Sequence, residues 1–186
     1  SEYYTIHVRD LVKNENLTDV IENTSGAITW SLDSKSFFYS KLDKFHRPRQ
    51  IFKHFLGKPL ESDELIFEEK DETFTCGIGL SSDEKYFIIS TSDHITTEEY
   101  FFNSTGDKLK PNLFKKRQKD VRYSLDSWGE YFYIHTNENA RDYKILRCKK
   151  DNIENLEEFV PSKKETVIGG LDFLDNYIIR AEKSDA

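Results

Sequence analysis

A short hairpin-like segment recurs along this chain at intervals of several dozen residues, and this repetition constrains the fold more than any other feature. Three copies are Ile28–Tyr39, Ile78–Ile89 and Val121–Tyr133, and a degenerate fourth copy covers Ile168–Ile179. Each copy combines a short strand, a turn centred on Ser and Asp, and a second strand of aromatic and β-branched residues. We therefore expect an antiparallel β-hairpin at each of the four positions.

The aspartate in each turn has a physical role. In the first three copies it is Asp33, Asp83 and Asp126, which lie 50 and then 43 residues apart. A carboxylate at such a position accepts hydrogen bonds from backbone amides two residues further on, which holds a turn tightly closed. Repeats of about 40–50 residues that each contain several strands are typical of β-propeller blades.

The segments between the hairpins supply the remaining strands. The strands expected after each hairpin are Tyr3–Val8, Gln50–Phe55, Glu98–Phe102 and Tyr143–Cys148. The strands expected before the next hairpin are Leu17–Ile21, Leu65–Glu68, Leu113–Arg117 and Leu156–Val160. No stretch shows helical periodicity beyond a turn or two. The predicted fold is all-β: an incomplete β-propeller of four-stranded antiparallel blades, with about 16 strands.

We expect three whole blades at 17–56, 64–103 and 112–148, with the outer strand of a first blade at 1–12 and a partial last blade at 156–183. The chain has 186 residues and no methionine, which agrees with an internal piece of a longer protein. Sheet edges left open in this way present unpaired backbone groups. We therefore expect an edge-to-edge or strand-exchange homodimer in preference to ring closure within one chain.

Charge and composition exclude several classes of protein. The chain has 27 basic and 34 acidic residues, a net charge of −7, so binding to nucleic acid is not expected. A basic run, Lys115, Lys116, Arg117 and Lys119, is interpreted as a solvated strand face. The aromatic share of 14% is too high for a disordered chain. No apolar run approaches the ~18 residues of a membrane span, and the first residues lack the pattern of a signal peptide.

No cofactor, metal site or catalytic residue is predicted. Cys76 and Cys148 lie far apart and are interpreted as free thiols of a reduced compartment. The histidines, which show no metal-ligand spacing and are interpreted as solvated or strand-face residues, are His7, His46, His54, His94 and His135. The nearest match to the G-x-S-x-G nucleophile motif, Gly79–Asp83, lacks the last glycine and falls inside a hairpin. The acidic run Glu68–Glu72 is open to three interpretations: a cation site, a binding loop or a solvated loop.

Residues 24–103 also carry a distinctive set of short motifs. They are Thr24–Trp30, Arg47–Pro48, His54–Gly57, Ser62–Asp63, Leu65–Asp71, Phe74 and the hairpin ending Ser92–His94. In combination they resemble the propeller domain of the bacterial oligopeptidase B (protease II) group, within the prolyl oligopeptidase family of serine peptidases. The similarity is close over this stretch and looser after it.

The resemblance implies a cytoplasmic enzyme that cleaves short peptides after Lys or Arg. In that family a seven-bladed propeller covers an α/β-hydrolase domain that holds a Ser-Asp-His triad, and the propeller filters substrates by size and access. None of the triad can be placed here, so we expect this chain alone to have no peptidase activity. Its implied partners are peptide substrates and the hydrolase domain of a parent chain. The alternative is a non-catalytic propeller that serves as a binding module or scaffold.

The resemblance also places substrate-facing loops in the predicted blade 64–103, at its A–B and C–D connections. The candidate residues are Asp71, Glu72, Phe74, Thr75, Asp93, His94 and Ile95. We expect the loops Asp71–Cys76 and Asp93–Thr96 to lie on one side of the blade. Their carboxylates, together with Glu69, would add negative potential that attracts basic peptides. The other interpretation is that these are solvated loop charges without a role.

Overall fold

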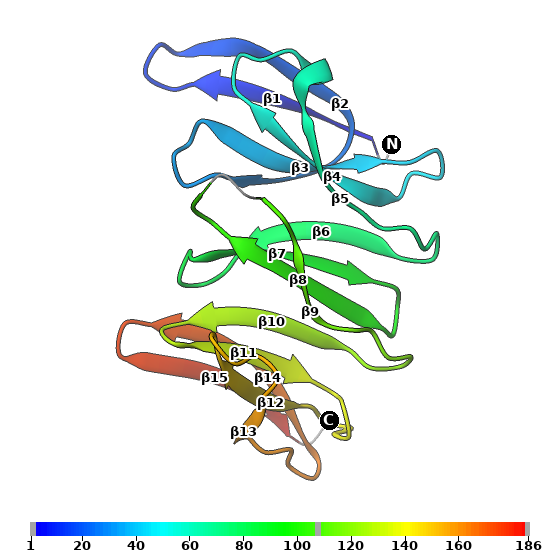
Figure 1. Ribbon diagram of the computed structural model, residues 1–186, viewed down its shortest axis with the longest axis vertical. Helices are drawn as coiled ribbons and strands as arrows, with labels where there is room; N and C mark the ends of the chain where they lie inside the picture. Colours follow the sequence, from blue (N-terminus) through cyan, green and yellow to red (C-terminus); the bar gives the residue numbers. More distant parts are fainter. Residues whose placement is uncertain (1–2, 107–108, 185–186) are drawn as a thin grey trace.

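The computed structural model describes residues 3–106 and 109–184, and almost all of its regular structure is β-strand (Figure 1). The strands are β1 (Tyr4–Asp10), β2 (Glu15–Trp30), β3 (Ser36–Leu42), β4 (Pro48–Phe55), β5 (Glu64–Glu68), β6 (Thr75–Leu80), β7 (Tyr86–Ser92), β8 (Thr97–Asn103), β9 (Asn112–Lys115), β10 (Tyr123–Trp128), β11 (Tyr131–Thr136), β12 (Lys144–Lys149), β13 (Glu157–Val160), β14 (Thr166–Leu174) and β15 (Tyr177–Ser184). One short 3-10 helix, η1 (Leu60–Ser62), lies between β4 and β5. The all-β prediction is confirmed, although residues 1 and 2 of the predicted segment 1–12 lie outside the described residues.

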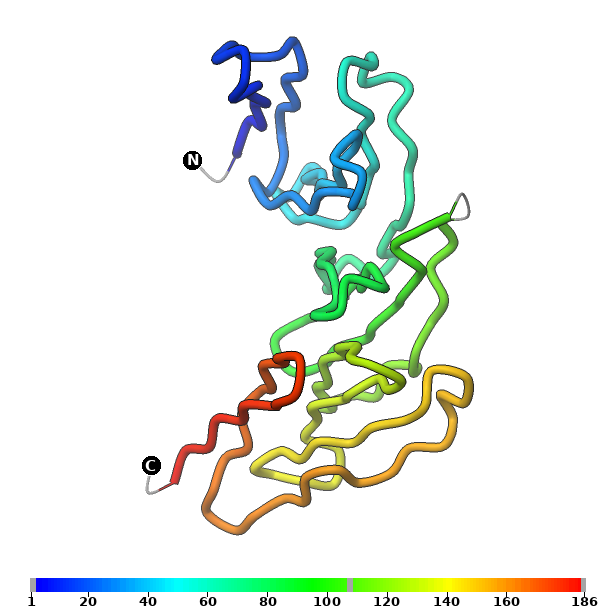
Figure 2. Tube along the Cα trace, turned by 90° about the vertical axis from the view of Figure 1, so that its left-hand side faces the viewer, coloured from blue at the N-terminus to red at the C-terminus, as the bar shows by residue number. Residues whose placement is uncertain are grey.

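Hydrogen bonding groups the strands into four sheets, in the orders β1-β2-β3-β4-β5, β6-β7-β8-β9, β10-β11-β12-β13 and β14-β15. Every pairing is antiparallel. The first three sheets follow one another in chain order along the long axis of the molecule, and the β14-β15 hairpin lies beside the third of them (Figures 1 and 2). We call them the first, second and third sheets and the last hairpin. Their antiparallel, mostly four-stranded construction confirms the predicted class of fold.

Strand β2 belongs to two hairpins at once. Its first half pairs with β1, from Tyr4↔Thr24 to Asp10↔Glu15. Its pairing with β3 begins at Thr24↔Lys41 and, after an irregularity, continues from Ile28↔Tyr39 to Trp30↔Phe37. The predicted strand at 17–21 and the first strand of the first hairpin are therefore one element. Between the halves Gly26 has φ +80, and a Cβ there would lie 2.8 Å from Cγ of Tyr4. A side chain at this position would therefore clash with the β1 strand.

The sheets are offset by one strand from the predicted blades. Strand β5 pairs with β4 (Gln50↔Glu68) and closes the first sheet, rather than opening the second. Strands β9 and β13 likewise close the second and third sheets. The complete four-stranded units therefore cover 28–68, 75–115 and 123–160. The alternation of apolar residues predicts that a strand exists, but it does not indicate which neighbour the strand pairs with.

Two of the three turn aspartates act as predicted. Asp33 Oδ1 accepts hydrogen bonds from Ser31 Oγ (2.7 Å) and the Lys35 amide (3.0 Å). Asp83 Oδ1 accepts the equivalent bonds from Ser81 Oγ (2.9 Å) and the Lys85 amide (3.2 Å).

The prediction for the third turn is wrong. Asp126 lies inside β10, where it pairs with Tyr133, and the chain turns instead between Trp128 and Tyr131. Gly129, with φ +60, allows this tighter turn. Asp126 reaches across to the second sheet, where it accepts bonds from the Ser82 amide (2.8 Å) and Oγ (2.6 Å).

The hydrophobic cores lie between the sheets. Phe38 of β3 packs against Phe87 of β7 with ring centroids 4.6 Å apart, and Phe101 of β8 packs against Phe132 of β11 at 4.9 Å. Phe38 and Phe87 are each 1% exposed. Truncating a buried phenylalanine to alanine typically costs about 3–5 kcal/mol. Contacts between neighbouring sheets therefore stabilise the row as a whole.

The two cysteines are free thiols buried in different cores, Cys76 between the first and second sheets and Cys148 between the second and third. Burial raises the pKa of Cys76 to about 12 and that of Cys148 to about 11. Neither thiol is therefore a candidate nucleophile at neutral pH. In the described part of the chain, no group of His, Cys, Asp and Glu could hold a metal ion, and no helix could span a bilayer.

Candidate functional site at the loop end of the second sheet

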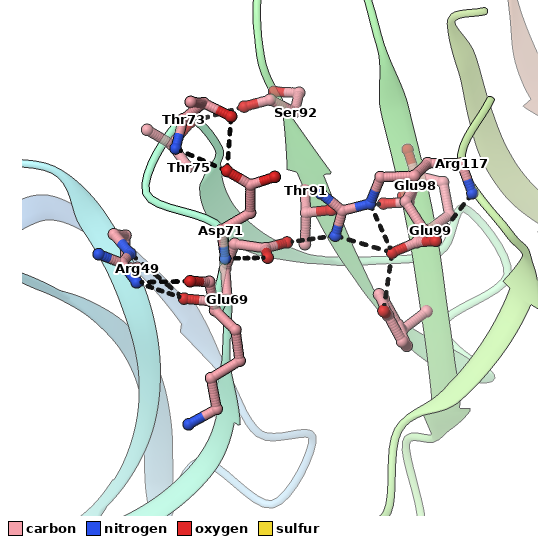
Figure 3. A network of polar contacts seen from close by, with 12 residues as sticks. Arg49, Glu69, Asp71, Thr73, Thr75, Thr91, Ser92, Glu98, Glu99 and Arg117 are labelled. Carbon is pink, nitrogen blue, oxygen red and sulfur yellow. Dashed lines mark hydrogen bonds and ion pairs between the residues drawn. The ribbon is translucent and has the colours of Figure 1, made fainter. Parts of the chain in front are cut away.

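The two predicted loops lie at the same end of the second sheet. Thr75↔Ser92 is the last pair of β6 and β7, and Thr75 Oγ1 donates to the Ser92 carbonyl oxygen at 3.4 Å (Figure 3). Segments 69–74 and 93–96 both leave the sheet there, beside segment 116–122, which leads from β9 to β10. We call these three segments the loop end. Segment 69–74 joins the first sheet to the second, and 93–96 joins β7 to β8, so they are not the A–B and C–D connections that we expected.

The first loop carries two exposed carboxylates. Asp71 Oδ1 accepts hydrogen bonds from the Thr73 hydroxyl (2.6 Å) and amide (2.9 Å), which hold the pKa of Asp71 below its usual range. The side chain of Glu72 is 71% exposed. Both carboxylates are acidic groups at the surface, so this loop presents negative charge to solvent at neutral pH.

The second loop is closed in the same way. Asp93 Oδ1 accepts hydrogen bonds from the amides of Ile95 (2.8 Å) and Thr96 (2.6 Å), and these bonds lower the pKa of Asp93. The charge of Asp71 acts in the opposite direction and raises that pKa, so the two carboxylates influence each other across the gap between the loops. His94 and Ile95 are exposed at the tip.

Phe74 does not share this exposure. It is 6% exposed, and the guanidinium of Arg117 lies 4.0 Å from its ring centroid. Thr75 is half-buried at the start of β6. The structure therefore brings Asp71, Glu72 and the 93–95 segment together at the surface, with Phe74 beneath them as support.

A buried ion cluster anchors the loop end. Arg117 Nη2 lies 2.6 Å from Glu69 Oε2 and 2.9 Å from Glu98 Oε2 (Figure 3). The Arg117 amide also donates to Glu98 Oε1 at 2.8 Å. Burial alone would raise the pKa of Glu98, but the hydrogen bonds from Arg117 and Tyr100 outweigh it and lower that pKa. The cluster joins the end of the first sheet, β8 and segment 116–122.

The prediction of a solvated basic face is therefore wrong for Arg117, and wrong in part for Lys115, which pairs with Glu138. Lys116 and Lys119 are exposed as expected. Arg117 and Glu69 lie 48 positions apart along the chain, so local sequence patterns carry no signal of this pair.

Arginines of the first sheet hold the acidic loop from the other side. Arg49 donates from Nε (3.2 Å) and Nη2 (3.0 Å) to the Glu69 carbonyl oxygen (Figure 3). The Nη1 atom of Arg49 also lies 3.7 Å from Glu72 Oε1. Arg47 donates to the Glu72 carbonyl oxygen at 2.9 Å. Backbone contacts of this kind fix the path of the loop, so its charges are presented from a defined position.

A second buried polar cluster lies in the first sheet. His54 is fully buried, with Nε2 2.8 Å from Asp19 Oδ1 and Nδ1 2.7 Å from Asp63 Oδ1. Burial alone would lower the pKa of His54, but the two carboxylates raise it overall, and two such bonds require an N–H on each ring nitrogen. His54 therefore lies in strand β4, as a strand-face histidine would, but it is buried between two carboxylates and is not solvated. Asp19 Oδ1 also accepts a hydrogen bond from the Gly57 amide at 2.6 Å. Residues of the His54–Gly57 and Ser62–Asp63 motifs thus form this buried cluster together with Asp19.

The whole chain matches one known protein family. Residues 1–186 match the family model described as prolyl oligopeptidase, N-terminal beta-propeller domain. The chain belongs to the prolyl oligopeptidase family. Among curated relatives in this family, Protease 2 of Moraxella lacunata is 31% identical over 184 residues, covering 91% of this chain and 27% of that protein. Dipeptidyl aminopeptidase BI of Pseudoxanthomonas mexicana is 28% identical over 98% of this chain and 26% of its own length.

Solved structures agree on the fold. Oligopeptidase B from Leishmania major superposes with a TM-score of 0.92 at 23% identity, covering 98% of this chain and 26% of that one. Oligopeptidase B from Trypanosoma brucei, solved in a closed form with covalently bound antipain, gives a TM-score of 0.85 at 22% identity, covering 91% of this chain and 24% of that one. The chain spans about a quarter of the length of the relatives it matches, and the β-propeller class of the fold is confirmed.

Proposed function

We propose that this chain is the gating and substrate-filtering propeller part of a serine oligopeptidase that cleaves short peptides after Lys or Arg. The observation that carries the proposal is the family match over residues 1–186, together with 31% identity to Protease 2. The parent protein would be a cytoplasmic, oligopeptidase B-like enzyme whose α/β-hydrolase domain supplies the catalytic triad. The propeller would form one wall of a cavity that excludes large substrates and bulk water.

The loop end supports this proposal through its charge. Asp71, Glu72 and Asp93 lie close together at one end of the second sheet, and the pKa values of both aspartates are lowered. Such a patch raises the local concentration of cationic peptides and speeds their encounter. The anchoring by Arg49 and Arg117 would keep the patch fixed while substrates enter.

The experiment that tests the proposal compares this chain with its parent protein. We expect the full open reading frame to continue into a G-x-S-x-G segment, and its product to hydrolyse a dibasic fluorogenic peptide. We expect this chain alone to give background hydrolysis only, because its sequence contains no G-x-S-x-G nucleophile motif. Replacing the Lys or Arg at the cleaved bond by a neutral residue should abolish turnover by the parent.

Two outcomes would contradict the proposal. A parent reading frame without a nucleophile motif would favour the alternative, a non-catalytic propeller that serves as a binding module or scaffold. Covalent labelling of this chain alone by a serine-directed reagent, prevented by prior heat denaturation, would show that the chain contains catalytic machinery of its own.

A further inference from the structure

A cavity of about 240 Å³ lies between the second and third sheets, next to the loop end. Its walls come from β8, the end of segment 116–122, β10, β11 and the segment before β12. The lining residues are Thr97, Glu99, Arg122, Tyr123, Ser124, His135 and Tyr143. The volume suits a small polar group with part of the chain that carries it. None of the lining residues belongs to the acidic patch or to the Arg117 cluster.

Glu99 gives the cavity an unusual polar wall. The residue is 2% exposed, and Ser90 Oγ donates to its Oε2 at 2.6 Å. Its other oxygen, Oε1, makes no hydrogen bond with any residue that the structure describes. Burial raises the pKa of Glu99 to about 8, so at neutral pH the group is mostly a neutral carboxylic acid that can donate a proton in a hydrogen bond.

The unused groups around the cavity are mainly donors. Within the described residues, the exposed guanidinium of Arg122 and the Ser124 hydroxyl have no hydrogen-bond or ion-pair partner. Thr97 and Tyr123, in contrast, are occupied with each other, since Thr97 Oγ1 donates to the Tyr123 carbonyl oxygen at 2.6 Å. The cavity thus offers one full positive charge, one hydroxyl and one weak acid.

Aromatic groups close the remaining wall. The rings of His135 and Tyr143 stack with centroids 4.6 Å apart and an interplanar angle of 15°. His135 Nε2 lies 2.7 Å from the Ile168 carbonyl oxygen, so this nitrogen donates to the last hairpin. Both rings line the cavity beside the donors, and aromatic rings in a pocket can pack against the short carbon chain that carries a carboxylate.

We propose that this cavity binds a carboxylate group, namely the C-terminal carboxylate of a short peptide. Arg122 neutralises the charge, while the Ser124 hydroxyl and the carboxyl proton of Glu99 donate to the carboxylate oxygens. A cationic ligand fits less well, because Glu99 is the only carboxyl in the lining and Arg122 repels a second cation. The peptide as the source of this group rests on the proposed function, but the carboxylate site itself does not.

The site has a definite pH dependence. The charged and titratable groups around Glu99 are Arg122, Tyr123, His135 and Tyr143 of the cavity lining, Glu98 on its own strand, and Lys115, its pairing partner on β9. Lys115 is paired with Glu138. Glu98 is engaged by Arg117 (Figure 3), and burial raises the pKa of Tyr123, so neither changes charge near pH 8. As the pH rises through 8, Glu99 ionises, stops donating and repels the bound carboxylate.

The test is an NMR titration of the ¹⁵N-labelled chain with N-acetylglycine, using the uncharged N-acetylglycinamide as the matched ligand. We expect the amide signals of Thr97 and Ser124 to shift with a dissociation constant on the order of millimolar for the acid only. Arg122→Gln should weaken binding about tenfold. Lys58→Gln, which removes an exposed charge at the opposite end of the first sheet, should leave it unchanged.

Equal shifts with the acid and the amide, or unchanged affinity in Arg122→Gln, would overturn the proposal. At pH 9 binding should weaken in the wild type and persist in Glu99→Gln, which stays neutral at every pH. If binding weakens equally in both proteins, Glu99 does not contribute to carboxylate binding. The titration needs no peptidase activity. A negative titration therefore does not contradict the proposed function, and an inactive parent enzyme does not contradict the carboxylate site.

Discussion

At the scale of single residues, buried charges are neutralised by partners distant in the sequence. Each ring nitrogen of His54 contacts one carboxylate, that of Asp19 or that of Asp63. The guanidinium of Arg117 forms ion pairs with both Glu69 and Glu98. Removing one partner from such a group leaves a buried charge without compensation, which typically costs about 3–5 kcal/mol. Sequence patterns predicted the local carboxylate of Asp33, because its partners are two residues away. They could not predict His54, whose partner Asp19 lies 35 positions away.

The His54 cluster should make stability depend on pH. The pKa of His54 is raised in the folded chain, so its stabilising effect is complete below the ordinary value near 6.5 and declines as the pH rises through the raised value. His54→Gln should therefore cost about 3 kcal/mol at pH 6, with a smaller difference from wild type at pH 9. Urea unfolding at both pH values measures this. An equal loss at pH 6 and pH 9 would show that the charge of His54 contributes nothing.

At the scale of elements, the strands and most hairpins could be predicted, whereas pairing could not. Alternating apolar residues indicated β5 and β9, but both were assigned to the wrong sheet. The backbone groups on the two edges of a strand are alike, so the sequence of a strand does not show which neighbour it pairs with. The third turn was misplaced for a local reason: Gly129 permits a turn two residues long, and Asp126 remains in the strand. The candidate loops were located correctly at a shared end, although they connect different strands from those expected.

We expect Arg117 to hold together the end of the first sheet, strand β8 and segment 116–122. Arg117→Met leaves Glu69 and Glu98 buried without their cation and uncovers Phe74, so we expect a loss of about 3–5 kcal/mol in the free energy of unfolding. Lys119→Met removes an exposed charge from the same segment and should change stability by less than about 0.5 kcal/mol. Chemical denaturation of both variants provides the comparison. Similar stabilities for the two variants would mean that the cluster does not anchor the loop end.

At the scale of the whole molecule, the row of sheets has two open edges in the part of the chain that the structure describes. The hairpin of β1 with the first half of β2 lies at one end, and the two-stranded β14-β15 hairpin lies at the other. Together these hairpins hold the four strands of one complete sheet. Tyr177 is 72% exposed and Ile179 is 54% exposed on β15, so this edge is apolar as well as unpaired.

We predict that two copies of the chain associate through these edges. Light scattering over a concentration series should show the mass rising from one chain towards two, because pairing satisfies the free backbone groups of both hairpins. Ile179→Lys should shift the equilibrium towards the monomer, while Lys58→Gln should not. A compact monomer at every concentration would instead favour closure within one chain.

If the proposed function is correct, the loop end of the second sheet attracts basic peptides in the parent enzyme. The direct measurement is kcat/KM of the full-length enzyme carrying Asp71→Asn, Glu72→Gln and Asp93→Asn together, with Glu61→Gln, Glu64→Gln and Asp151→Asn at the opposite end as the matched control. We expect kcat/KM to fall about tenfold for a multiply basic peptide at low salt, to fall less at high salt and to change little for a single-arginine ester. The control variant should behave like the wild type. An equal, salt-independent loss for both substrates, or no loss for either, would contradict this expectation.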